Sequence, residues 1–472
     1  MGSSTSTGRR ITRRSRSRRR CTTLCTHSSN TRWHRVPPHR RRPGRQATVQ
    51  FAHASDSRLV VAARGVRAFA YGLMGVLLAV ALSQRGLTPV GIGAIITVSL
   101  VGDFFGTYVI ALHADRWGRR RTLAVLAGLM ALTGAIFGLV SNYPILLLAG
   151  FFGTLGTSAS ETAPFLPIEQ AIVPQIVPAE RRTGIFARYN LVASFAAAIG
   201  ALVAGLPDLL SHAGIALTSG IRLMFGVYVL AGLGAVLLAL RLSPAVEVHD
   251  AWARSANGPR VAERRRLIPA MGRSRPIVLR LAALFSVDSL AGGLVAQSLV
   301  ALYFHLRFGI PLGPLGVLFF AANTLSAISF LAAVPLARRF GLLNTMVFTH
   351  LPSNALLVLV AFMPTFPLAA GVLLLRQLLS QMDVPTRQAY TMALVAPAER
   401  TAAASVTSLA RSAGSAASPV ISGALLQGAL LTLGLPLVIA GVTKCVYDLS
   451  LWRIFRQVPI EEGRPADTTT SG

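Results

Sequence analysis

Apolar runs of about 20 residues recur from residue 60 almost to the carboxy terminus, and they limit the possible folds more than any other feature. A helix of that length spans roughly 30 Å, the thickness of the hydrocarbon core of a bilayer. Such runs must be helical there, because lipid offers the backbone no hydrogen-bond partners. We expect twelve spans, over residues 63–84, 89–112, 120–140, 143–168, 184–205, 221–241, 278–304, 312–335, 341–363, 367–392, 402–428 and 433–454. The sequence therefore predicts an all-α membrane protein with twelve transmembrane helices.

The composition agrees with this interpretation. Of the 472 residues, 53% are hydrophobic and only 13% are charged, whereas soluble domains are about 45–50% apolar and about 25% charged. Cys21, Cys25 and Cys445 form neither a disulfide framework nor a zinc motif. The sequence also contains no metal-ligand cluster, phosphate-binding glycine loop or nucleophile triad, so we expect no enzyme activity and no cofactor.

The arginines predict how the helices are oriented. Basic residues lie in alternate connections between the spans, namely Arg116, Arg119, Arg120, Arg121, Arg181, Arg182, Arg338, Arg339, Arg400 and those of residues 242–277. The opposite connections are nearly bare. Because positive charge stays on the cytoplasmic side, we expect both termini in the cytoplasm, with the protein in a bacterial-type plasma membrane.

The amino-terminal segment, residues 1–58, differs from the rest. The net charge of +29 includes fourteen arginines within residues 1–50, where no acidic residue occurs. We expect a disordered tail over residues 1–58, because it has too little apolar surface to fold. A polyanion-binding arm, a transit peptide and an anchor for anionic lipid are alternatives. We expect no nucleic-acid partner, because neither an amphipathic pattern nor interleaved aromatic residues accompany the arginines.

The chain also repeats itself. Gly86 is matched by Gly309, residues 167–171 are matched by 385–389, and residues 178–181 are matched by 397–400, all at a nearly constant offset along the chain. These ordered matches predict two copies of a six-helix unit, over residues 59–241 and 278–455. Residues 242–277 are then a basic linker and residues 456–472 a carboxy-terminal tail.

The loop after the second span carries a family resemblance. Residues 111–121 read Ala-Leu-His-Ala-Asp-Arg-Trp-Gly-Arg-Arg-Arg, which resembles the cytoplasmic signature of the major facilitator superfamily, Gly-x-Leu-Ala-Asp-Arg-x-Gly-Arg-Arg. Ala111 and His113 depart from it, and the second copy, residues 335–341, lacks the acidic residue. The resemblance covers about residues 60–455. It implies two six-helix halves around a central cavity, a monomer, and secondary transport of a small solute by alternating access.

The signature loop has an expected role of its own. Its members are Asp115, Arg116, Gly118 and Arg119. Gly118 permits a tight turn, and a carboxylate such as Asp115 is stabilised at a helix N-terminus. The resemblance implies that Asp115 contacts the start of the eleventh span, near residues 400–404, and latches one end state. The alternative is a charge cluster that only sets the topology.

Ionisable residues near the bilayer centre are costly and are therefore candidates for function. The resemblance places the first, fourth, seventh and tenth spans around the cavity. The candidates for binding substrate or protons are Asp288, Glu161, Asp383, Arg376, Asp103 and Tyr71. Prolines interrupt the fourth and tenth spans at matching points, which points to a binding site between the repeats.

Two charge pairs are expected inside the membrane. Glu169 and Arg387 occupy equivalent positions in the two copies, so we expect them to gate the path or to pair with each other. Lys444 and Asp448 lie four positions apart, which favours a structural pair on the twelfth span. Asp288 or Glu161 is expected to load and release a proton, because burial favours the neutral form of a carboxylic acid. The alternative for these charges is a structural ion pair, such as Asp383 with Arg387.

These observations favour a secondary transporter of a small organic solute, with the proton as coupling ion and export as the direction. A small-residue-rich fifth span without a Gly-Pro pair weakens the case for a drug–proton antiporter. A facilitator-like membrane protein that acts as a sensor or assembly partner without transport is the alternative.

Overall fold

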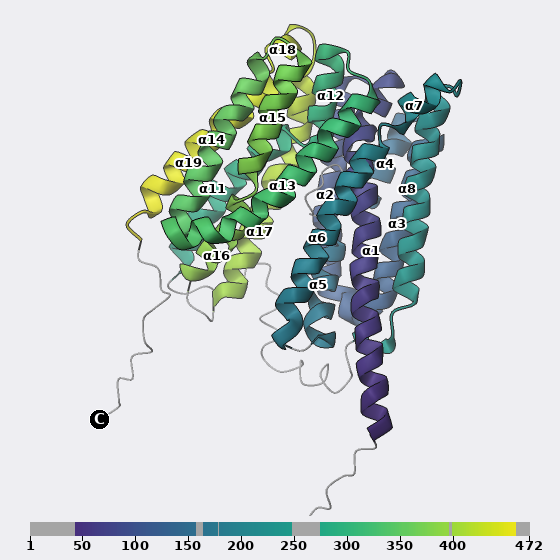
Figure 1. Ribbon diagram of the computed structural model, residues 1–472, viewed down its shortest axis with the longest axis vertical. Coiled ribbons are helices and arrows are strands. Elements are labelled where there is room, and N and C mark those ends of the chain that lie inside the picture. Colours follow the sequence, from purple (N-terminus) through teal and green to yellow (C-terminus); the bar gives the residue numbers. More distant parts are fainter. Residues whose placement is uncertain (1–42, 157–163, 178, 248–273, 396–398, 459–472) are drawn as a thin grey trace, which may run out of the picture. The chain divides into compact units, whose positions relative to one another are not determined.

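The protein is described by a computed structural model over residues 43–156, 164–177, 179–247, 274–395 and 399–458. Every regular element in these ranges is helical (Figure 1). The chain divides into two compact units, residues 1–47 and 48–472, and the fold below is that of the second. Residues 1–42 of the predicted tail, most of the predicted linker and residues 459–472 lie outside the described ranges.

The amino-terminal helices are α1 to α8. Their bounds are α1 Pro43–Gln84, α2 Pro89–Trp117, α3 Arg119–Leu139, α4 Tyr143–Phe152, α5 Phe165–Ile176, α6 Ala179–Val203, α7 Leu206–His212 and α8 Leu217–Leu240. Local sequence explains several ends: the Thr88 hydroxyl and Asn142 amide oxygens accept hydrogen bonds from the first turns of α2 and α4. α1 begins at Pro43, so residues 43–58 of the predicted tail are helical in the structure. Extending an existing helix costs far less than nucleating one.

The carboxy-terminal helices follow a short 3₁₀ turn, η1 Pro244–Val246. They are α11 Arg275–Leu294, α12 Gln297–Phe308, α13 Leu312–Phe340, α14 Leu342–Phe362, α15 Phe366–Ser380, α16 Asp383–Ala393, α17 Arg400–Leu425, α18 Ala429–Thr432 and α19 Leu435–Phe455. Gly341 turns the chain between α13 and α14 with φ 82°, as Gly118 does between α2 and α3 with φ 91°. Both conformations suit glycine.

Nine helices among the described residues are long and apolar enough to cross a membrane. This criterion leaves out three of the predicted spans. The fourth is split into α4 and α5, the tenth is split into α15 and α16, and the eleventh, α17, is rich in alanine and serine. The multi-pass, all-α membrane architecture is thus established, and the number twelve remains a prediction.

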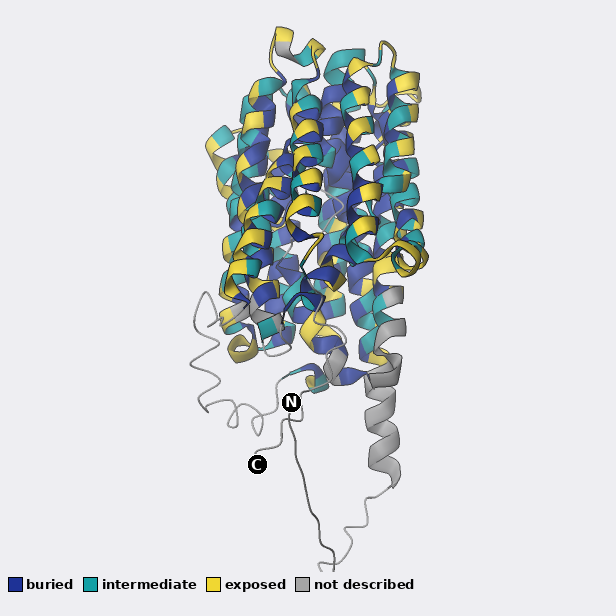
Figure 2. Cartoon of the chain, turned by 90° about the vertical axis from the view of Figure 1, so that its left-hand side faces the viewer, coloured by how far each residue is buried: buried dark blue, intermediate teal, exposed yellow. Residues whose placement is uncertain are grey.

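The largest core surrounds α1. Its residues from Ala70 to Leu82, apart from Gly72 and Gly75, belong to one apolar cluster that includes residues of α2, α8, α12 and α13. Large apolar side chains elsewhere face outward, including Leu139, Leu230 and Leu331. Figure 2 shows the alternation of buried and exposed stripes along the helices. Water would make these outer stripes costly, whereas lipid solvates them.

The amino-terminal and carboxy-terminal helices pack most closely where glycines face backbone. On α2 and α17, a Cβ atom at Gly93 would lie 2.3 Å from the Pro419 carbonyl oxygen, and one at Gly423 would lie 2.2 Å from the Pro89 oxygen. The Val420 amide also donates to the Thr97 hydroxyl at 3.1 Å. A second contact joins α6 to α13. Small residues let helix backbones approach each other in lipid. The amino-terminal and carboxy-terminal helices are therefore closed against each other at the end where α2 begins and α17 ends.

Substituting Gly93 tests that contact. Alanine at Gly128, which has open space around its Cα, is expected to stabilise α3 by up to about 1 kcal/mol through helix propensity. Gly93→Ala should instead destabilise the protein by roughly 1–3 kcal/mol, since the methyl group overlaps backbone. Thermal unfolding of the two purified variants gives the comparison. Equal melting temperatures would contradict the packing described.

Candidate functional site

Asp288 is the centre of a buried charge cluster in the carboxy-terminal helices. It lies on α11 and is 4% exposed. Its Oδ1 accepts a hydrogen bond from Lys444 Nζ of α19 at 2.5 Å, and its Oδ2 accepts one from Arg387 Nη1 of α16 at 3.3 Å. Arg411 of α17 approaches Oδ2 to 3.8 Å. Four helices therefore meet at one carboxylate.

The break in the tenth predicted span positions part of this cluster. α15 ends at Ser380 and α16 begins at Asp383, whose carboxylate thus lies in the first turn of a helix, where negative charge is favoured. Arg387 Nη1 donates to Asp383 Oδ2 at 2.8 Å, so one guanidinium bridges two carboxylates. Arg376, on α15, bonds the side chain of Gln377 at 2.9 Å and forms no ion pair within the described chain.

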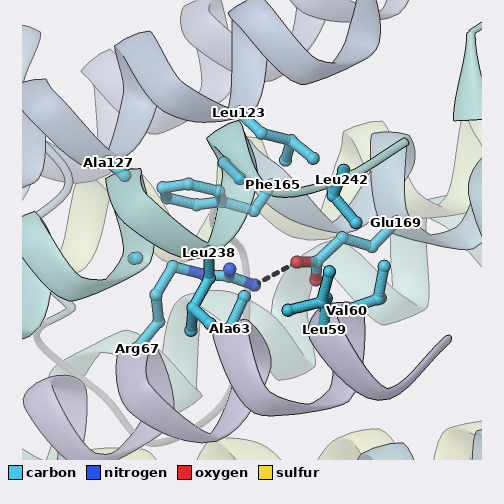
Figure 3. Close-up of a pocket in the computed structure, with 12 residues that line it drawn as sticks. Leu59, Val60, Ala63, Arg67, Leu123, Ala127, Phe165, Glu169, Leu238 and Leu242 are labelled. Carbon is cyan, nitrogen blue, oxygen red and sulfur yellow. Dashed lines mark hydrogen bonds and ion pairs between the residues drawn. The ribbon is translucent and has the colours of Figure 1, made fainter. Parts of the chain in front are cut away.

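Glu169 is the centre of a second cluster, in the amino-terminal helices (Figure 3). It lies on α5 and is 2% exposed. Arg67 Nη2 of α1 donates to its Oε1 at 2.6 Å, and the Tyr189 hydroxyl of α6 donates to its Oε2 at 2.6 Å. Aromatic rings cover Arg67 and a second arginine of α1, Arg64. The Arg67 guanidinium lies 4.2 Å from the ring centroid of Phe165, and the Arg64 guanidinium lies 4.9 Å from the ring centroid of Tyr189.

The two clusters occupy equivalent positions of the repeat with the charges reversed. Asp288 is the counterpart of Arg67, and Arg387 is the counterpart of Glu169, because both spacings fall within the range of the repeat offsets. The Arg67–Glu169 pair between α1 and α5 is therefore matched by an Asp288–Arg387 pair between α11 and α16. Each cluster lies beside a break, α4 to α5 or α15 to α16.

Desolvation explains why these groups are paired. An ion moved from water into a low-dielectric interior loses solvation worth several kcal/mol, and a close counter-ion recovers it only in good geometry. Asp288, Asp383 and Glu169 each have an arginine or lysine nitrogen within 3.3 Å. A helix movement that separates such a pair must supply another partner, such as water, a substrate or a proton.

Three other candidates lie elsewhere. Glu161 lies outside the described residues. Asp103, on α2, is partly buried and forms no ion pair with the described residues. Tyr71, on α1, is buried, and its hydroxyl has no hydrogen-bond partner among the described residues.

The expected charge pairs differ from the observed ones. Glu169 pairs with Arg67, and Arg387 pairs with Asp288 and Asp383, so each binds within its own set of helices. The prediction of a Lys444–Asp448 pair was wrong, because Lys444 binds Asp288. Helical spacing identifies residues on one face, but neighbouring helices decide their partners.

The signature loop is held by a residue that sequence reasoning missed. Glu247 accepts hydrogen bonds from the backbone amides of Arg119 and Arg120, at 2.7 and 3.1 Å, and thereby caps the N-terminus of α3. Asp115 pairs with Arg119 at 2.8 Å and is 55% exposed. The Arg116 side chain is exposed. The side chains of residues 400–402 are not among those described, so the latch remains a prediction.

Sequence reasoning also missed Arg67 and Tyr189. Arg67 falls near the edge of its predicted span, where arginine is ordinary. The repeat offset contained the signal, because it makes Arg67 the counterpart of Asp288. It likewise makes Tyr189 the counterpart of Arg411, which is another member of the carboxy-terminal cluster.

Unfolding measurements test the amino-terminal cluster. Arg67→Met should lower the free energy of unfolding by roughly 3–5 kcal/mol, because Glu169 then stays buried without its cation. The Arg67→Met/Glu169→Gln double variant should lose less than the sum of the single variants, since no buried charge is left alone. Arg58→Met, at an exposed position on α1, should change stability by no more than about 0.5 kcal/mol. Additive single effects would contradict the pairing.

Comparison with known proteins places this geometry in a family. The sequence profile of the Major Facilitator Superfamily matches residues 60–419. An uncharacterized membrane protein of Saccharomyces cerevisiae is 28% identical over an alignment of 400 positions, which covers 80% of this chain and 89% of the yeast protein. A D-xylose–proton symporter superposes with a TM-score of 0.66 at 16% identity, covering 86% of this chain and 99% of its own. The nucleoside transporter NupG superposes with a TM-score of 0.63 at 15% identity, covering 86% and 99%. These two structures establish the likeness of fold alone.

Proposed function

The chain belongs to the major facilitator superfamily, a family of membrane transporters and not of enzymes, and on that premise we propose that it moves a small organic solute by proton-coupled alternating access, in the direction of export. The observation that carries this proposal is the pair of buried, charge-reversed clusters beside the helix breaks. Intramembrane ion pairs at such breaks are typical of substrate and ion pathways.

Alternating access is supported by the uneven packing of the two sets of helices. Glycine contacts hold α2 to α17 and α6 to α13 at one end. A rocking motion about the centre would open that end and close the other. The reversed charges suit such a motion. A carboxylate released in one set of helices, such as Glu169, has a cation, Arg387, at the equivalent position of the other set.

Proton coupling is supported by the charge count around Asp288. Lys444, Arg387 and Arg411 surround this carboxylate. Any step that withdraws one cation changes the local charge by one, and a proton is the simplest ion to restore it. A solute that enters the cavity and competes for a cation is thereby linked to proton movement.

Flux measurements test the coupling and its direction. Purified protein in liposomes is given an imposed pH gradient and a panel of labelled sugars, nucleosides and organic anions. We expect at least one solute to move in the direction opposite to the protons. Asp288→Asn should reduce this gradient-driven flux at least about tenfold, which corresponds to a barrier change of about 1.4 kcal/mol. Arg280→Gln on the exposed face of the same helix is the matched control and should leave the flux unchanged. Flux that ignores both the gradient and Asp288→Asn would overturn the coupling.

A further inference from the structure

Asp448 forms a buried hydrogen-bonded group with α14 that the transport pathway above does not include. Its carboxylate, on α19, is fully buried. Its Oδ1 lies 2.9 Å from His350 Nδ1, and its Oδ2 accepts a hydrogen bond from Asn354 Nδ2 at 2.9 Å. His350 and Asn354 are also buried. His350 Nδ1 also lies 3.1 Å from Asn354 Nδ2. Its contact with the carboxylate oxygen is favourable only with a proton between the two atoms, because two lone pairs would repel.

The charges around Asp448 make His350 its counter-ion. Asp288 and Asp383 are matched by Lys444 and Arg387. Within the described chain, no lysine or arginine nitrogen forms an ion pair with Asp448. Its pair with His350 is neutral only when it holds one proton beyond the imidazole's own, as imidazolium with carboxylate or as imidazole with carboxylic acid. Histidine is the side chain best suited to gain and lose that proton near neutral pH.

Lys444 connects this pair to the candidate site. It lies one helical turn before Asp448 on α19, so both side chains leave the same face. Its Nζ is 2.5 Å from Asp288 Oδ1. Lysine carries its charge on a flexible four-carbon stem, so two carboxylates on either side of it compete for one ammonium group.

We propose that His350 and Asp448 form a proton site that switches Lys444 between two carboxylates. With the proton bound, the pair is neutral and Lys444 stays on Asp288, as in the structure. When the proton leaves for solvent, Asp448 carries an unmatched negative charge and draws Lys444 away. Asp288 then keeps Arg387 and Arg411 as its cations among the described residues. The proposal deepens the proposed proton coupling by locating the proton on α14 and α19.

Other charged and titratable groups on the neighbouring helices enter the pH response of the switch. On the helices packed against α14, these groups are Lys444, Cys445, Tyr447 and Asp448 of α19, Arg376 of α15, Asp383, Arg387 and Tyr390 of α16, and Arg338 and Arg339 of α13. Asp288 of α11 also interacts electrostatically with His350. Among them, Lys444 shares a helix face with Asp448 and already binds Asp288, which is why the switch is assigned to it.

The composition provides a site-specific probe, since Lys444 is the single lysine of the chain. Full-length protein labelled with [¹⁵Nζ]lysine in lipid nanodiscs gives one ammonium resonance in solid-state NMR. We expect this resonance to shift between pH 5 and pH 9 with the same midpoint as the imidazole nitrogens of His350. A chemical shift of Lys444 that stays constant over this range would overturn the proposal.

Two substitutions should fix the switch in opposite states. In His350→Gln, Asp448 loses the group that neutralises it, so Lys444 should show the high-pH resonance at every pH. In Asp448→Asn, the competing charge is absent, so Lys444 should keep the low-pH resonance. His113→Gln, at a histidine that contacts a backbone carbonyl and the Trp117 ring of its own helix, should leave the wild-type titration unchanged.

The outcomes separate the switch from the transport proposal. Titration of Lys444 that persists in His350→Gln with an unchanged midpoint would overturn the switch, whatever the flux assays give. A switch that behaves as described in a protein whose flux ignores pH would leave this inference standing and overturn the coupling.

Discussion

Pairing of ionised groups away from water is the interaction on which the rest of this structure depends. Helices in lipid can be assembled from apolar stripes alone, so nothing in the packing requires Asp288, Lys444 or Arg387 to be present. Yet these three meet with distances of 2.5 and 3.3 Å on helices far apart in the chain. Because an unpaired charge there costs more than most single contacts provide, each member fixes the arrangement of the others.

The two clusters carry opposite charges at equivalent positions of the repeat. A strictly symmetric repeat would place the same charge at equivalent positions in both sets of helices. Here Arg67 and Glu169 are matched by Asp288 and Arg387. Glycine contacts and a hydrogen bond between α2 and α17 hold one end together, and a helix movement can undo them without separating charges. Small residues thus form the contacts that move, and the ion pairs provide the energetic coupling.

The general fold followed from the sequence, whereas the partners in the site did not. Span length, arginine placement and the signature loop were enough to predict an all-α membrane protein of this superfamily, and Asp288, Asp383, Arg387 and Glu169 were recognised as intramembrane charges. Local spacing failed for Lys444, because its i,i+4 neighbour Asp448 has closer partners on α14. Glu247 was missed because its capping role exists only once the chain returns to α3. Contacts between distant helices are tertiary facts, and a repeat offset is the one sequence signal that anticipates some of them.

Alternating access is the central claim, and paired distance measurements test it most directly. Spin labels at Gln84 and Gln427 report the glycine-packed end, and labels at Leu112 and Ala404 report the other, after replacement of the native cysteines; all four label positions are exposed. Double electron–electron resonance across pH 5 to pH 9 should show the first distance lengthening as the second shortens. Distances that change in the same direction, or that do not change with pH, would contradict the account.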